Sequence, residues 1–177
     1  VVVSLFLGLT VSAEEIIRDQ KIRKRESFLN LSNGSYLGSK IVIMFTLSAV
    51  QMITFILVGN TILEIKGMTF DYWLILFSTA CFANMLGLNI SATFNSAVTI
   101  YILIPFLLVP QLLFSGLIVK FEKLNPVVTS QTEVPILSGD IWTSRWAFEA
   151  LAVNQFRSNK YEQIFYPYNR DEKSANW

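Results

Sequence analysis

Residues 72–119 read YWLILFSTACFANMLGLNISATFNSAVTIYILIPFLLVPQLLFSGLIV, a run of 48 residues that contains no Asp, Glu, Lys or Arg. As a single helix this run would be about 72 Å long, more than twice the roughly 30 Å hydrocarbon core of a bilayer. The run must therefore fold back once, and its most polar point is the cluster at residues 89–96. We predict a tight turn near Asn95 and Ser96, which leaves two membrane spans of roughly 72–93 and 97–119.

Two further apolar runs precede this one. Residues 41–63 are 23 residues without a charge, long enough to span a bilayer with some tilt. Residues 1–11 are apolar but would cover only about half of the bilayer core, so we interpret them as the second half of a span that begins upstream. An apolar N-terminal tag is the alternative. The sequence thus predicts an all-α fold, a polytopic helical membrane domain with the end of one span and three full spans.

Beyond Lys120 the chain becomes mixed and polar, and we do not expect it to span the membrane again. We therefore divide the chain into a partial transmembrane domain at 1–120 and an external or interfacial segment at 121–177, the start of an extracytoplasmic loop. Residues 139–156 carry Trp142, Trp146 and Phe148. Aromatic residues at this density beside a span are typical of an interfacial helix in the aromatic belt.

The composition excludes several classes of protein. Hydrophobic residues make up 53% and charged residues 15% of the chain, and the mean hydropathy is +0.48. These values leave too few charges to cover a soluble surface. The net charge of +1 argues against a nucleic-acid partner, which would need a basic face. The absence of His and the presence of a single cysteine, Cys81, leave no basis for a His–metal site, a cysteine zinc cluster or a Ser–His catalytic pair, so we expect no metal site.

The distribution of basic residues predicts the orientation of the spans. The loop 13–40 carries six Lys and Arg residues, the 64–71 link carries one and the 94–96 turn carries none. By the positive-inside rule the 13–40 loop is cytoplasmic. The spans then place 121–177 on the extracytoplasmic side of a multi-pass protein, which we expect in the plasma (inner) membrane with the lipid bilayer as its surroundings.

The spans contain no Asp, Glu, Lys or Arg, but uncharged hydrogen-bonding side chains lie within them, among them Gln51, Asn84, Asn89 and Gln111. Such amides usually form hydrogen bonds between helices, worth about 1 kcal/mol each. The alternative is that they line a polar cavity or a transport route. Because the full spans hold no Asp, Glu, Lys or Arg, they offer no obvious coupling to a proton gradient or to voltage. If this domain moves a substrate, we expect the energy to arrive from another part of the protein.

The charged block at 13–29 predicts a cytoplasmic helix that ends at the turn residues 30–35. Its acid-then-base pairs lie four residues apart, in the stabilising order: Glu14 with Arg18, and Asp19 with Arg23. Such a helix either lies on anionic lipid head groups or provides a docking surface for a cytoplasmic partner.

Three stretches resemble one family in their order and spacing. Residues 14–40 (EEIIRDQKIRKRESFLNLSNGSYLGSK) carry an Arg-Glu, Tyr and Lys pattern, residues 114–119 read FSGLIV, and residues 145–156 read RWAFEALAVNQF. Together they resemble the membrane domain of ABC transporters of the G subfamily, which are type-2 exporters. Two residues depart from the family pattern, with Trp146 in place of Tyr and Gln155 in place of an acid. The stretch 127–140 is also longer than in eukaryotic multidrug members, so the external structure and the substrate do not follow from the resemblance. We expect a fragment of a bacterial member.

The resemblance implies the membrane-spanning permease part of an ATP-driven ABC exporter, with a substrate pathway at the interface of a homo- or heterodimer. The helix at 13–29 would be the coupling helix, which rests on a nucleotide-binding domain. ATP and Mg would bind to that domain, which this chain lacks, and no cofactor is expected here. The implied site residues fall into three groups: Arg18, Arg25, Glu26 and Phe28 for coupling to the ATPase domain, Val109 and Leu112 for the substrate cavity, and Leu117 and Ile118 for an apolar plug.

Two rival functions remain open at this point. The chain could be a non-transporting membrane anchor or signalling domain that holds an external domain, and a Walker motif upstream would discriminate between this and the exporter. An intramembrane enzyme is the weaker rival, because the spans contain no paired acids or nucleophile–base set. No G-x-x-x-x-G-K-[ST] motif occurs in the chain, so these residues are not expected to act as an enzyme themselves.

Overall fold

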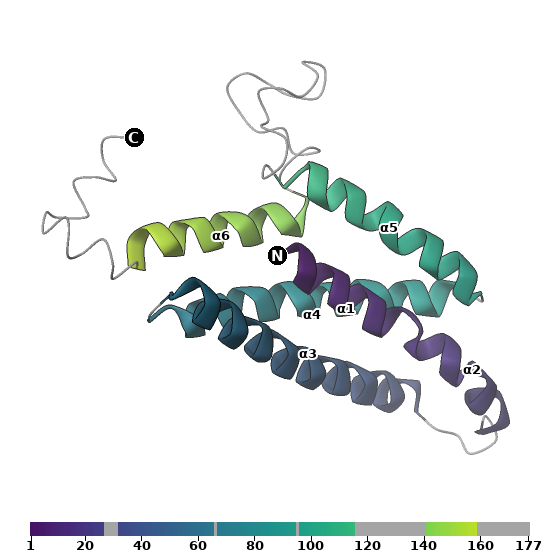
Figure 1. Cartoon of the computed structure of the whole chain (residues 1–177). Helices are drawn as coiled ribbons and strands as arrows, with labels where there is room; N and C mark the ends of the chain where they lie inside the picture. The colour runs from purple at the N-terminus through teal and green to yellow at the C-terminus, as the bar shows by residue number, and fades with distance from the viewer. Residues whose placement is uncertain (27–31, 66, 95, 116–140, 159–177) are drawn as a thin grey trace, which may run out of the picture.

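The computed structural model describes residues 1–26, 32–65, 67–94, 96–115 and 141–158. Every regular element in this part of the chain is a helix (Figure 1). The helices are α1 (Val2–Ala13), α2 (Glu15–Glu26), α3 (Asn33–Leu63), α4 (Thr69–Thr93), α5 (Ala97–Leu113) and α6 (Thr143–Ser158). The predicted all-α helical membrane domain is confirmed.

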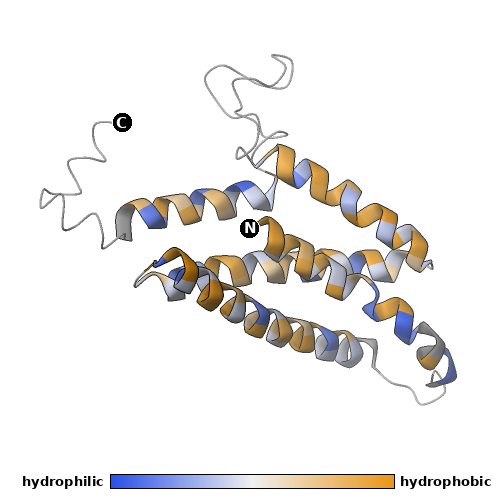
Figure 2. Ribbon diagram, viewed as in Figure 1, coloured by the Kyte–Doolittle hydropathy of each residue, from blue (hydrophilic) through white to orange (hydrophobic). Residues whose placement is uncertain are grey.

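The helices α3 and α4 are long and apolar enough to cross a bilayer. Most residues of both helices are apolar (Figure 2). Most residues of α3 are exposed. Of the third predicted span, 97–119, the structure describes residues 97–115. The helix α5 has 17 residues, about 25 Å, and ends at Leu113, where the Ser115 hydroxyl donates a hydrogen bond to the carbonyl of Leu112. Residues 116–119 lie outside the described part.

The helix α4 is the centre of the bundle and contacts α1, α2, α3 and α6. The helix α1 packs most extensively on it, through small residues one turn apart: Ser4, Gly8 and Ser12. A Cβ atom at Gly8 would lie 2.7 Å from Ala83 Cβ, and one at Gly87 would overlap the hydroxyl of Ser12. The two backbones therefore approach more closely than larger side chains would allow, as is common between membrane helices.

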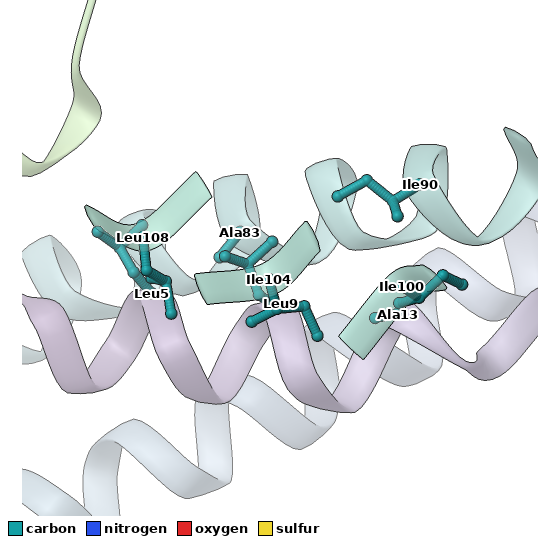
Figure 3. Close-up of a cluster of buried hydrophobic side chains, with 8 residues drawn as sticks. All are labelled: Leu5, Leu9, Ala13, Ala83, Ile90, Ile100, Ile104 and Leu108. Atoms are coloured by element: carbon teal, nitrogen blue, oxygen red, sulfur yellow. The ribbon is translucent and has the colours of Figure 1, made fainter. Parts of the chain in front are cut away.

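A core of buried aliphatic side chains joins α1, α4 and α5 (Figure 3). The α5 members recur every four residues, so one face of α5 covers α1 while the opposite face stays exposed. The cluster consists of Leu5, Leu9 and Ala13 from α1, Ala83 and Ile90 from α4, and Ile100, Ile104 and Leu108 from α5. A second cluster holds α3 on α4 and contains Met52, Ile56, Leu76 and Ala80.

The connections gather at the two ends of the bundle. The α4–α5 turn, α2 and the start of α3 share one end, and the α3–α4 link lies at the other, together with α6 (Figure 1). The predicted turn near Asn95 and Ser96 is confirmed, because α4 ends at Thr93 and α5 begins at Ala97. In the α3–α4 link, Glu64 and Gly67 adopt positive φ angles of 54° and 85°.

The predicted turn at 30–35 is wrong in its second half. The helix α3 begins at Asn33, eight residues before the apolar run 41–63. The physical reason is a contact with α2. Tyr36 and Lys40 lie one helical turn apart, and both bind Asp19 of α2, which requires helical backbone between them.

Of the four amides singled out from the sequence, two connect helices, in agreement with the first of the two interpretations. The Asn84 side chain on α4 donates hydrogen bonds to Ser48 Oγ at 2.7 Å and to the Met44 carbonyl at 3.3 Å, both on α3. The Gln111 side chain accepts a hydrogen bond from the Ser144 amide at 3.2 Å and thereby caps the start of α6. Asn89 instead donates to the carbonyl of Met85 on its own helix.

Candidate functional site at the α1–α2 junction

The chain passes from α1 into α2 with a single residue, Glu14, between the two helices. The first N–H groups of a helix have no partner within the helix, and a side chain at its start usually satisfies them. In α2 this role falls to a distant residue. Ser91, near the end of α4, accepts hydrogen bonds from the Ile16 amide at 3.0 Å and the Ile17 amide at 3.2 Å. Ser91 is fully buried, so water does not compete for these two bonds.

A cluster of charges holds the same turn of α2 against α3. The Lys40 ammonium forms ion pairs with Glu15 and Asp19, both at 2.6 Å, and the Tyr36 hydroxyl donates a hydrogen bond to Asp19 at 3.1 Å. The side chains of Lys40, Glu15 and Asp19 are only 15%, 11% and 19% exposed, so solvent screens these pairs less than an ordinary surface pair. The hydrogen bond from Lys40 is the main cause that lowers the pKa of Asp19 below its usual value.

The helix α5 reaches the same junction. Its residue Ile100 is fully buried in the core cluster that includes Ala13, the last residue of α1. Thus α3, α4 and α5 each contact a different part of the segment 13–19, and the junction lies where the spans meet.

The helix predicted at 13–29 is confirmed over Glu15–Glu26, and its role in coupling stays a prediction. Ala13 belongs to α1, α2 covers Glu15–Glu26, and residues 27–29, with Phe28 among them, lie outside the described part. Arg18 has a 72% exposed side chain and forms an ion pair with Glu15 at 2.9 Å. The sequence had predicted Glu14 as its partner. Arg25 is also exposed, and Glu26 is the last residue of α2.

The predicted cavity residues lie near the end of α5. Val109 is 51% exposed and belongs to the face of α5 that points away from the bundle core, whereas Leu112 is partly buried. The exposed face of α5 is an apolar stripe made of Val98, Tyr101, Ile102, Phe106, Val109 and Leu113. The predicted plug residues, Leu117 and Ile118, lie outside the described residues.

The helix α6 begins against the end of α5. Besides the bond between Gln111 and the Ser144 amide, the Ser144 hydroxyl donates to the Gln111 carbonyl. The rings of Phe114 and Trp142 stack at 5.4 Å between centroids. From there α6 contacts α4 as well as α5, so the predicted helix at 139–156 exists, begins at Thr143 and packs on the bundle.

Sequence reasoning missed the residues that join α2 to the spans. Ser91 lies in the polar cluster at 89–96, which predicted only a turn, and its partners are about 75 residues away in the chain. The sequence indicated Lys40 only as the Lys of the family pattern in 14–40 and as one of six basic residues in that loop. It indicated Glu15 only as one charge in the block 13–29. Among the described residues, no three His, Cys, Asp or Glu side chains are grouped as metal ligands would be.

These features are those of a helical membrane domain. The described residues form a bundle of apolar spans with one short charged helix fixed at its end. The chain matches the family model of the ABC-2 type transporter over residues 1–156, so it belongs to that family. It is a membrane component of an ABC transporter with a permease role, and the family domain is not itself catalytic.

One relative supports the same conclusion. The chain is 24% identical over 160 residues to a protein described as ABC transporter G family member STR from Medicago truncatula. The match covers 88% of this chain and 18% of the relative, so the chain spans about a fifth of the length of that protein. No solved structure matches the chain.

Proposed function

We propose that this chain is the permease part of an ATP-driven exporter and that α2 receives the force produced by a nucleotide-binding domain. The observation that carries the proposal is the placement of α2. Its first turn is held by buried polar contacts to α3 and α4, while its later residues Ile22 and Arg25 are exposed. A helix held at one end and exposed at the other is suited to transmit a displacement from a partner to the spans.

The chemistry of the spans supports an external energy source. The described parts of α3, α4 and α5 contain Lys40 and Asp71 near helix ends, and their apolar middles contain no Asp, Glu, Lys or Arg. The partner therefore supplies the energy, and ATP and Mg would bind to that partner. Arg18 and Arg25 lie on exposed parts of α2, where they complement acidic groups on a nucleotide-binding domain. Glu26 and Phe28 complete the proposed contact.

The exposed apolar stripe of α5 is the proposed wall of the substrate pathway. Val109 and Leu112 would face the pathway at the interface with a second membrane half, which is either a copy of this chain or a related one. Leu117 and Ile118 would form an apolar plug that closes the substrate pathway at its outer end. The positive-inside rule supports a cytoplasmic location for residues 13–40 and an extracytoplasmic location for 121–177 in the plasma membrane.

Charge reversal on α2 tests the proposal. In the full transporter, reconstituted in proteoliposomes, Arg25→Glu should uncouple ATP hydrolysis from transport. The matched control is Glu149→Lys, which reverses an exposed charge on α6 at the other end of the bundle. An exposed charge contributes about 1 kcal/mol or less to stability, so both variants should fold.

The outcomes separate the two functions that the sequence left open. Loss of coupling in Arg25→Glu alone supports the exporter. Normal coupling in Arg25→Glu would contradict the role of α2. A reconstituted parent without ATP-dependent transport would favour the non-transporting anchor.

A further inference from the structure

The described polar contacts that join α2 to α3 and α4 lie at residues 15–19, near its start. Ser91 binds the amides of Ile16 and Ile17, and Lys40 binds the carboxylates of Glu15 and Asp19. The contacts come from two different spans, α4 and α3. Two different spans therefore bind the start of α2.

Ser91 acts as the N-cap of α2, although it belongs to a different helix. The amides of Ile16 and Ile17 are the second and third of α2, the two that a cap side chain normally binds. The residue directly before α2 is Glu14, which is already the C-cap of α1. Without Ser91 these amides would lose their described side-chain partner, and Ile16 is only 5% exposed.

The α1–α2 junction is the natural place for a bend. Glu14 has φ −98° and ψ −9° and separates the two helices by a single residue. If α2 were joined to the bundle only through Glu14, a displacement of its exposed end would be absorbed as rotation about this residue. The Ser91 bonds lie directly after it and connect α2 to the buried end of α4.

We propose that Ser91 is a positioning residue for energy coupling, whose hydroxyl joins the first turn of α2 to α4 so that both move as one body. Lys40 supports the same turn from α3. This inference rests on the proposed function, because it assumes that a partner displaces α2. It assigns the transmission step to Ser91, a buried side chain within a span.

The first experiment measures the contact itself and requires no ATP. Hydrogen exchange of the peptide that covers residues 14–20 is compared in the full transporter in nanodiscs for the parent, Ser91→Ala and Ser78→Ala. Ser78 is the matched control, because it is an exposed serine of α4 whose hydroxyl binds the Ile75 carbonyl of its own helix. Loss of two buried hydrogen bonds predicts roughly tenfold faster exchange in Ser91→Ala and no change in Ser78→Ala. Equal exchange in all three proteins would overturn the inference.

The second experiment measures transmission. Spin labels are placed at Ile22 on α2 and Phe70 at the far end of α4, both exposed, after Cys81 is replaced by alanine. Trapping with ATP and vanadate should leave the distance between the labels unchanged in the parent and in Ser78→Ala, because α2 and α4 move together. In Ser91→Ala the distance should shift or broaden, and ATP hydrolysis should continue.

The outcomes distinguish this inference from the proposed function. Faster exchange in Ser91→Ala without a change in the trapped distance would show that Ser91 only stabilises α2, and would overturn its role in coupling. A parent transporter that does not hydrolyse ATP would contradict the proposed function and the coupling role together. The exchange experiment would still decide whether Ser91 holds α2.

Discussion

Replacing Gly8 by alanine should weaken the contact between α1 and α4. The added Cβ would lie 2.7 Å from Ala83 Cβ and 2.8 Å from the Ala80 carbonyl oxygen, and neither atom belongs to a side chain that can rotate away. Ordinary contact at a Cβ begins at 3.4 Å, so the helices must separate by about 0.7 Å. Such overpacking costs about 1–3 kcal/mol. Alanine gains at most about 1 kcal/mol over glycine in helix propensity, so the cost prevails.

The matched control is Gly59→Ala on α3, where an added Cβ meets nothing within 4 Å. Both variants and the parent are heated in detergent, and the fraction that remains folded is measured by size-exclusion chromatography. We expect Gly8→Ala to be less stable than the parent by about 1–2 kcal/mol. Gly59→Ala should equal or exceed the parent. Equal midpoints for the two variants would refute the close packing of α1 on α4.

Three further outcomes are expected. Asn84→Ala should destabilise the α3–α4 contact, and a double-mutant cycle with Ser48→Ala should give a coupling energy of about 0.6–1.7 kcal/mol; additive effects would contradict the hydrogen bond. Gln111→Leu should speed hydrogen exchange at the start of α6, and unchanged exchange would show that α6 is held otherwise. Because Lys40 lowers the pKa of Asp19 below 3.8, the stability gained from ionised Asp19 is complete above that pH. The stability difference between parent and Asp19→Asn should therefore stay constant from about pH 8 to 5 and shrink only below about pH 3.8, as melting curves would show.

The positions of the spans were predictable because they follow from local composition. A charge-free run of 48 residues must fold back in a bilayer, and the polar residues around Asn95 are the favourable place for the turn. The end of α5 was not predictable in the same way. The sequence stays apolar up to residue 119, so composition gives no signal at Leu113, where the helix ends.

The site was predictable only in outline. The charge pattern indicated a helix at 13–29, but pairs within one helix were expected to satisfy its charges. In the structure Asp19 binds Lys40 from another helix, and Ser91 caps α2 across a long stretch of chain. These contacts depend on which helices become neighbours, which the periodicity of one segment does not encode. The same contacts explain why α3 begins at Asn33, although residues 30–35 favour a turn.

The proposed coupling role of α2 depends most directly on where this helix docks. A photo-cross-linking amino acid placed at Ile22, an exposed residue of α2, tests this in membranes that contain the full transporter. The same amino acid at Phe70, at the opposite end of the bundle, is the control. We expect adducts with the nucleotide-binding domain from position 22 and none from position 70. Adducts only with lipid from position 22, or equal adducts from both positions, would contradict the coupling role of α2.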